Sequence, residues 1–501
     1  MAESRSGPTE LAYHVDMTYP STAPSSYSRI VAVAGVLTCA CGSDNGGTGE
    51  ATGTGAADSS STVVDPSTGD SSGPADSGSG DPSSTGPSMT TTPVPECGNG
   101  VREDPEQCDD GNLRPGDGCD VDCTEIVDTS LWQDVVGGSA SVEEAAQAVA
   151  FDTLGNVIAA GWIVDVVGAP DIWLRKYSPN GDVLWTQTFD PSGGDADRAF
   201  GVAVAQDDTI AVTGTAGVGM TTGDIWTARL SADGVAFWEQ TVDGPLGEHD
   251  SGNGVAVDDG FNVWVTGFVR TGAGDDDIWV GEYDSSGMLL FSEFVAGPAE
   301  LEDHGQGIAV DADGNAFAAG YVSDVEFGGD VWLRKYAPDG SVAWTTGFDS
   351  QNHGVDEAYG VAVAPDGSVG VAGFTSLTAI NADVWLGKFA NEDGELTWQK
   401  KFGGPEILDD AGLAVAADSQ GAFVVAGFKG IAEVDTDIWV RKWAGDGAVA
   451  WTQSVVGAGG DRDFAYGVAV DGNDDIAVVG ELRERANNNG DIWVAKLGGN
   501  P

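Results

Sequence analysis

A unit of 53 or 54 residues that recurs seven times is the feature that most limits the fold of this sequence. Three landmarks mark each unit independently: the tripeptide Asp-x-Trp, a glycine that closes an apolar run, and an aromatic residue in a further apolar run. The aspartates are Asp171, Asp224, Asp277, Asp330, Asp383, Asp437 and Asp491. The glycines are Gly161, Gly214, Gly267, Gly320, Gly373, Gly427 and Gly480. The aromatics are Trp132, Trp185, Trp238, Phe291, Trp344, Trp398 and Trp451.

Each unit contains four short apolar segments separated by Asx and Gly turns, as in "APDGS" at 337–341. Four short strands in about 50 residues are typical of one blade of a β-propeller. The first segment of a unit is rich in Gly, Ala and Val, which suits a crowded axis, and Trp occurs in the third and fourth segments. The sequence therefore predicts an all-β fold, a seven-bladed β-propeller over residues 130–498. A parallel β-solenoid is the main alternative, but its coils are normally shorter.

An incomplete hairpin predicts how the ring closes. Residues 130–136, "SLWQDVV", resemble the fourth strand of a unit, yet no Asp-x-Trp strand precedes them. The last unit has the opposite defect, because it ends after its third strand, "DIWVAKL" at 491–497. We expect the N-terminal strand to pair with the last one, which leaves no open edge in the final blade.

Two of the units, "HDSGNGVAVDDGFNVWVTGF" at 249–268 and "DHGQGIAVDADGNAFAAGY" at 303–321, resemble the SBBP-type bacterial propeller repeat. The likeness spans all seven units, although "QAVAFDTLGN" and "AGLAVAADSQG" depart from it.

The segment ahead of the propeller divides into three parts. Residues 1–41 contain "IVAVAGVLTCACGSD" after Arg29, an apolar core of signal-peptide length that resembles a bacterial lipoprotein signal. The resemblance implies lipidation at Cys41, with Cys39 as the alternative, and an ordinary cleaved secretory signal is the competing interpretation. Residues 42–95 are almost wholly Gly, Ser, Thr, Asp, Pro and Ala, a composition that predicts a disordered linker because it cannot bury enough apolar surface.

Residues 96–125 hold four clustered cysteines, Cys97, Cys108, Cys119 and Cys123. Such clustering suggests two disulfides and an oxidising compartment, and the spacing lacks the paired CxxC of a zinc site. The pattern CGNG…CDDGN…GDGC…C resembles the Cys-rich repeat of myxobacterial surface proteins, which is related to Notch-type (LNR) modules. The resemblance implies a disulfide-stapled module and bound Ca²⁺, for which Asp109, Asp110, Asn112 and Asp117 offer oxygen ligands. The alternative is that these residues only form Asx turns.

An acidic residue recurs before the first strand of each unit. The seven residues are Glu144, Asp197, Asp250, Asp303, Asp356, Asp409 and Asp463. They predict a ring of carboxylates on one face of the propeller. Repetition in every unit favours a structural role, in which each carboxylate accepts backbone N–H groups. Cation binding near the channel is the alternative.

Residues that break the repeat are better candidates for binding. His249, His304 and His353 occupy this loop in three consecutive units and could bind a transition metal. The alternative is that they are exposed loop histidines on blades too far apart to share one ion. Trp264 replaces smaller or aliphatic residues at its position and could be a platform for a ligand, with a packing role as the alternative.

The formal net charge of −59 argues against nucleic acid as a partner and against electrostatic attachment to anionic lipid. The sequence contains no P-loop, no G-x-S-x-G and no H-E-x-x-H motif. We therefore expect a monomeric, non-catalytic scaffold that binds a protein or glycan. It would lie at the cell surface or outer membrane through a lipid anchor, or be secreted. No cofactor is implied except Ca²⁺. The alternative is an extracellular polysaccharide lyase or hydrolase that uses the propeller's central funnel.

Overall fold

The computed structural model describes residues 102, 106–109, 119, 123–124, 126–137, 144–164, 168–219, 222–324, 328–350, 354–378, 381–403, 408–432, 435–457, 462–483 and 490–499. The predicted signal, linker, Cys39, Cys41 and Cys97 lie outside these residues, as do Asp110, Asn112, Asp117 and His353. Every regular element in the described ranges is a β-strand, and none of these residues belongs to a helix able to cross a membrane.

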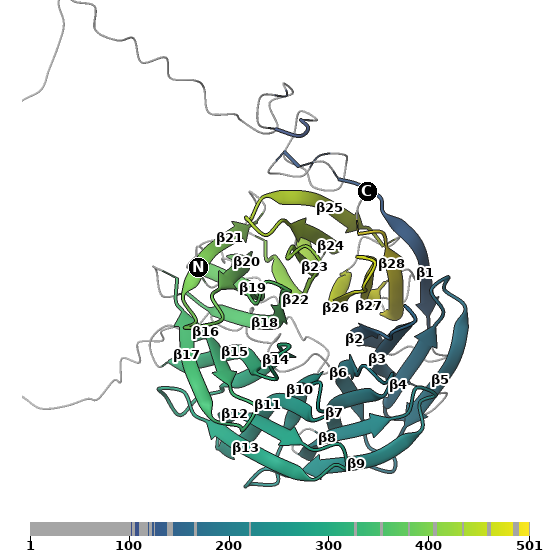
Figure 1. The fold of residues 1–501 in the computed structure, drawn as a ribbon, viewed down its shortest axis with the longest axis vertical. Helices are drawn as coiled ribbons and strands as arrows, with labels where there is room; N and C mark the ends of the chain where they lie inside the picture. The colour runs from purple at the N-terminus through teal and green to yellow at the C-terminus, as the bar shows by residue number, and fades with distance from the viewer. Residues whose placement is uncertain are drawn as a thin grey trace, which may run out of the picture. The chain divides into compact units, whose positions relative to one another are not determined.

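The strands form seven four-stranded antiparallel sheets arranged as the blades of a propeller (Figure 1). Each blade starts with an inner strand near the axis and ends with an outer strand at the rim. Blade 1 comprises β2 (Ala145–Phe151), β3 (Val157–Ile163), β4 (Asp171–Tyr177) and β5 (Val183–Phe189). Blade 2 comprises β6 (Arg198–Val204), β7 (Ile210–Gly219), β8 (Thr222–Leu230) and β9 (Ala236–Val242). Blade 3 comprises β10 (Ser251–Val257), β11 (Val263–Gly272), β12 (Asp275–Tyr283) and β13 (Leu289–Val295).

The remaining blades follow the same order. Blade 4 comprises β14 (His304–Val310), β15 (Ala316–Asp324), β16 (Gly328–Tyr336) and β17 (Val342–Phe348). Blade 5 comprises β18 (Asp356–Val363), β19 (Val369–Thr378), β20 (Asn381–Phe389) and β21 (Leu396–Phe402). Blade 6 comprises β22 (Ala411–Ala417), β23 (Phe423–Ala432), β24 (Asp435–Trp443) and β25 (Val449–Val455). Blade 7 comprises β26 (Phe464–Val470), β27 (Ile476–Leu482), β28 (Asp491–Leu497) and β1 (Ser130–Val136).

The predicted fold and its closure are confirmed. β1 pairs with β28, with Val135 opposite Trp493 and Val136 opposite Ile492. The inner strands β2, β6, β10, β14, β18, β22 and β26 contact one another in sequence, and β26 contacts β2. The ring is therefore closed through a blade whose outer strand comes from the opposite end of the propeller sequence.

The Asp-x-Trp tryptophan of each blade is buried in the junction with the preceding blade. Trp226 of blade 2 packs with Ile158 and Leu174 of blade 1, and Trp385 of blade 5 stacks on Phe348 of blade 4 with ring centroids 4.9 Å apart. The core consequently lies mainly between blades rather than inside one, as adjacent sheets stack face to face. The sequence landmark is the residue that joins one unit to the next.

The outer-strand tryptophans tie each blade to the following one. The indole N–H of Trp185 donates to the carbonyl of Ala232, and that of Trp238 donates to the carbonyl of Ser285, in the β-turns of the next blades. Each such turn contains a glycine with positive φ, such as Gly234 at 78°. A Cβ on Gly234 would lie 3.3 Å from the ring of Trp185, so this glycine serves both the turn and the close contact.

The landmark glycine of the second strand recurs for a different reason, the close approach of the neighbouring inner strand. A Cβ on Gly267 would collide with the carbonyl oxygen of Ser251 on the neighbouring inner strand. The inner strand shifts register next to this contact, between Gly252 and Gly254, and the same shift recurs at the corresponding place in the other blades. Glycine is therefore required where the bulged inner strand approaches.

The segment before β1 contacts the outer strand of blade 6. Ile126 forms a parallel bridge with Thr452 of β25, and the Val127 N–H donates to the Thr452 carbonyl. Thr129 donates through its N–H and its hydroxyl to Gln453 Oε1 at 3.0 and 2.6 Å. The outer edge of blade 6 is thus covered, and Trp451 on β25 is buried, whereas its counterparts Trp185 and Trp238 are only partly buried.

Deletion of residues 130–137 should lower the melting temperature sharply, because blade 7 would lose its outer strand and expose β28. Thermal unfolding followed by circular dichroism measures the effect. Leu131→Ser is the control, because Leu131 is an exposed residue of the same strand and its replacement should change stability by less than about 0.5 kcal/mol. An unchanged melting curve for the deletion would show that the ring does not depend on this closure.

Candidate functional site

The recurring acidic residues staple the loops that connect successive blades. In six junctions the carboxylate accepts the backbone N–H of a residue 20 positions later, at the end of the second strand. These pairs are Glu144 with Val164, Asp197 with Gly217, Asp250 with Arg270, Asp303 with Ser323, Asp410 with Gly430 and Asp463 with Arg483. The second oxygen of Asp250 and of Asp463 also accepts the N–H of the residue six positions earlier. These bonds account for the recurrence of the residue by local architecture.

The predicted ring needs one correction, in blade 6. Asp410, not the predicted Asp409, makes the equivalent bond there, to the Gly430 N–H at 2.8 Å. Asp409 instead accepts the Ala382 N–H at 3.0 Å. The interval between Asp356 and the next equivalent residue is therefore 54, and the sequence "LDDAG" offers two adjacent aspartates that spacing alone does not distinguish.

Burial makes three of these carboxylic acids weaker than they are in water. It raises the pKa of Asp250, Asp303 and Asp463 to about 6, although backbone N–H groups act in the opposite direction. A buried carboxylate that is only partly compensated by dipoles binds its proton more tightly than one in water.

Two of the predicted histidines contact the ring of Phe268. The His304 ring stacks on Phe268 with centroids 3.9 Å apart, and the His249 ring meets Phe268 edge-on at 5.6 Å. His304 Nε2 lies 3.1 Å from Asp276 Oδ2, and Asp276 also pairs with Arg270. The third histidine, His353, lies outside the described residues.

This histidine cluster is a packed polar core. His304 and Asp276 are essentially inaccessible to solvent, and burial lowers the pKa of His249 to about 4, so that this ring is neutral at pH 7. Although burial acts to raise the pKa of Asp276, hydrogen bonds and charges from His304 and Arg270 hold it below its ordinary value. Asp276, Glu302 and His304 present ligand atoms within 4.8 Å of one another, but the Arg270 guanidinium already supplies positive charge there.

Trp264 is fully buried between Phe291 and Tyr336, with ring centroids 6.2 and 6.0 Å away. It has no exposed ring face on which a ligand could stack, so it fills the junction between blades 3 and 4.

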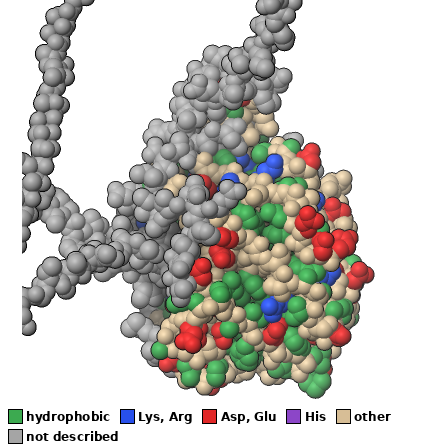
Figure 2. All heavy atoms as spheres, turned by 90° about the vertical axis from the view of Figure 1, so that its left-hand side faces the viewer, with side chains coloured by type: hydrophobic (Ala, Val, Ile, Leu, Met, Phe, Trp, Pro, Cys, Tyr) green, Lys and Arg blue, Asp and Glu red, His purple; other side chains and the backbone are tan. Residues whose placement is uncertain are grey.

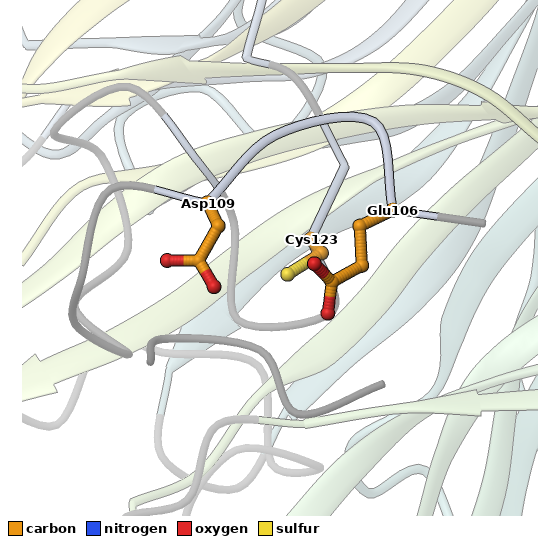
Figure 3. A group of neighbouring side chains, drawn as sticks. All are labelled: Glu106, Asp109 and Cys123. Atoms are coloured by element: carbon orange, nitrogen blue, oxygen red, sulfur yellow. The ribbon is translucent and has the colours of Figure 1, made fainter. Parts of the chain in front are cut away.

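In the Cys-rich segment a disulfide joins Cys108 and Cys119. Figure 3 shows Glu106, Asp109 and Cys123, whose ligand atoms lie within 4.8 Å of one another. Cys123 is itself disulfide-bonded, so it offers no thiolate to a metal ion. Of the four oxygen ligands predicted for Ca²⁺, Asp109 alone is among the described residues.

Acidic clusters that could hold a metal ion occur at three blade junctions, again with ligand atoms within 4.8 Å of one another. The clusters are Asp171, Asp190 and Asp197; Asp224, Asp243 and Asp250; and Asp330, Asp349 and Asp356. Each joins the Asp-x-Trp aspartate and the residue after the outer strand to the ring carboxylate of the following blade.

Glu282 is a symmetry-breaking residue that the three landmarks did not reveal. The other six blades have a basic residue at this place in the third strand, as in the buried ion pair of Lys442 and Asp418 at 2.8 Å. Burial, together with the nearby Asp258 carboxylate, raises the pKa of Glu282 to about 7. Alignment of the seven repeats at this position would have revealed the exchange.

Comparison with known proteins shows similarity of fold only. No family model matches the sequence, and a search of curated proteins finds no match. A protein of unknown function from Dyadobacter fermentans is 12% identical, with 74% of this chain and 98% of the other covered and a TM-score of 0.44. BamB from Moraxella catarrhalis is 15% identical over 74% and 100% of the two chains, with a TM-score of 0.37. The polysaccharide lyase Uly1 is 10% identical over 70% and 90%, with a TM-score of 0.45. Likenesses this distant carry no functional argument.

Glu282→Lys should raise the melting temperature at pH 8 by about 2–4 °C, because it replaces a repelled carboxylate with the cation that six other blades use. The folded-state pKa of Glu282 is raised, so its contribution to stability is present below pH 4.5 and is lost as the pH rises through about 7. The gain should therefore be much smaller at pH 4.5.

Differential scanning fluorimetry across pH 4.5–8 measures this gain. Glu300→Lys makes the same charge change at an exposed loop residue and serves as the control. Equal gains for both variants, or a gain for Glu282→Lys that does not depend on pH, would refute the assigned environment of Glu282.

Proposed function

We propose that this protein is an exported, lipid-anchored surface protein whose propeller is a non-catalytic platform for binding another protein. In this proposal Cys41, or Cys39, carries the lipid. The linker and the Cys-rich module, with the Ca²⁺ implied by its resemblance to LNR modules, hold the SBBP-type propeller away from the membrane.

An apolar belt on the rim of the propeller is the observation that carries the proposal. The belt consists of Leu131, Leu184, Phe237 and Leu290, which are 57, 51, 62 and 49% exposed. Each residue directly precedes the landmark aromatic of its outer strand, so all four occupy the same place in β1, β5, β9 and β13. These strands follow one another along the rim (Figure 1). Exposed apolar side chains at the same place on four neighbouring blades offer a surface that a protein partner could cover.

The belt is specific to one side of the ring. Blades 4, 5 and 6 have Ala343, Thr397 and Ala450 at the same position. Figure 2 looks onto the side of the molecule that bears β17, where acidic side chains outnumber basic ones and apolar side chains lie between them. The net charge of −59 favours a partner whose apolar contact surface is bordered by basic residues.

A protein fits the belt better than a glycan does. Leucine and phenylalanine side chains supply apolar contact area but no hydrogen-bonding groups, whereas sugar hydroxyls need hydrogen-bond partners when they leave water. The enzyme alternative has weaker support in the part of the chain that the structure describes, because the contacting imidazole and carboxylate of His304 and Asp276 are both buried. A general acid or base must reach the substrate.

Replacing Leu184, Phe237 and Leu290 with Glu in one variant should weaken binding to the partner more than tenfold. The matched control replaces Ala343, Thr397 and Ala450 with Glu, which adds the same charge at the same strand position on the opposite side. The partner is first isolated from surface proteins of the source cells with immobilised wild-type protein, and affinity is then measured by surface plasmon resonance with the purified partner.

Equal loss of affinity in both variants would place the interaction elsewhere. Binding on a glycan array that both variants retain would identify a glycan ligand instead of a protein. Release of oligosaccharides from any polysaccharide by the wild-type protein would refute the non-catalytic proposal.

A further inference from the structure

Three blade junctions each bring three carboxylates together. In the cluster between blades 4 and 5, Asp330 lies on β16, Asp349 follows β17, and Asp356 begins β18. Other junctions have Ala296, Gly403 or Val456 in place of Asp349. The cluster therefore brings together two strands of one blade and the inner strand of the next.

Asp356 differs from its counterparts in how its oxygens are satisfied. Its Oδ2 accepts the Ser350 N–H at 2.5 Å, but its Oδ1 has no hydrogen-bond partner among the described residues, although the side chain is fully buried. A buried carboxylate oxygen without a partner is costly in free energy.

The local backbone explains why this oxygen is unpaired. The N–H of Ser376 is the counterpart of the Arg270 and Ser323 N–H groups, which donate to Asp250 and Asp303. In blade 5 the Ser376 N–H donates instead to the carbonyl of Val355 at 2.9 Å. One buried carboxylate oxygen at this junction is thus left for another ligand.

The electrostatics of the junction favour a cation. Burial raises the pKa of Asp356, and the negative charge of Asp349 acts in the same direction. Lys401, on β21, acts against it. Three carboxylates with ligand atoms within 4.8 Å repel one another in the ionised state, and a bound cation removes that repulsion.

We propose that Asp330, Asp349 and Asp356 bind one Ca²⁺ ion at the junction between blades 4 and 5. Carboxylate oxygens are hard ligands, and the three residues offer no nitrogen or sulfur that would select zinc. Ca²⁺ accepts six to eight oxygens in flexible geometry, so water completes its shell, whereas Mg²⁺ requires near-ideal octahedral geometry. The ion links β16, the end of β17 and the start of β18. This site is separate from the one implied for the Cys-rich module and does not depend on the proposed function.

Isothermal titration of the full chain with CaCl₂, after treatment with EDTA and dialysis, tests the site. Wild-type protein should bind calcium, and Asp349→Asn should bind one equivalent less, with MgCl₂ unable to replace calcium at equal concentration. Asp349 is exposed, so its substitution should not impair folding, and the melting temperature without calcium checks this. Calcium at 1 mM should raise the melting temperature of the wild type more than that of the variant.

Two controls define the site. Asp339→Asn removes an exposed carboxylate from the same blade and should keep the wild-type stoichiometry. Asp243→Asn removes the equivalent of Asp349 from the junction between blades 2 and 3, where both oxygens of Asp250 accept backbone N–H groups, and should also keep it. Unchanged stoichiometry in Asp349→Asn, or no calcium binding by the wild type, would overturn the proposal. Loss of one equivalent in Asp243→Asn would overturn its assignment to the unpaired oxygen of Asp356.

Discussion

The packing of the Asp-x-Trp tryptophan against the preceding blade is the interaction on which the other features depend. A single four-stranded blade has two apolar faces and cannot bury either alone, so it is stable only between neighbours. Phe189 and Trp226 meet at the junction of blades 1 and 2, and Phe402 and Trp439 at that of blades 5 and 6, with ring centroids 6.0 and 5.2 Å apart. The Asp-x-Trp tryptophan is buried at every one of the seven junctions. Each blade therefore depends on both neighbours, and closure into a ring holds the loops between blades in nearly equivalent positions.

The repeat made most of the fold predictable from sequence. The landmarks identified the number of blades, the order of their strands and the partner of β1, since each depends on local residue types that recur. The landmark glycine and tryptophan have roles that periodicity could not supply. Gly267 leaves space for the Ser251 carbonyl, and Trp185 donates a hydrogen bond to a turn in the next blade. Both contacts depend on how strands and blades are aligned in the folded molecule.

The polar sites were less predictable, because their chemistry depends on the burial of each side chain and on which backbone groups lie within hydrogen-bond distance. The spacing located the acidic ring within one residue, but it chose Asp409 where Asp410 makes the staple. Histidines in a loop suggested accessible ligands, whereas His304 lies beneath Phe268 and beside Asp276. The unpaired oxygen of Asp356 arises from one backbone N–H that changes its acceptor, and no sequence pattern reports such an exchange.

The position of β1 at the start of the propeller sequence affects the order in which the molecule folds. β1 precedes its partner β28 by about 360 residues, as in the contact of Gln133 with Trp493, so it is the first strand of the propeller to be synthesised and the last to find its partner. Contacts of such long sequence separation form slowly. Until then the backbone of β1 lacks the partner strand that pairs with it in the finished ring. The six blades between must therefore assemble around an unclosed gap, and the chain becomes a ring only when its final strand is released.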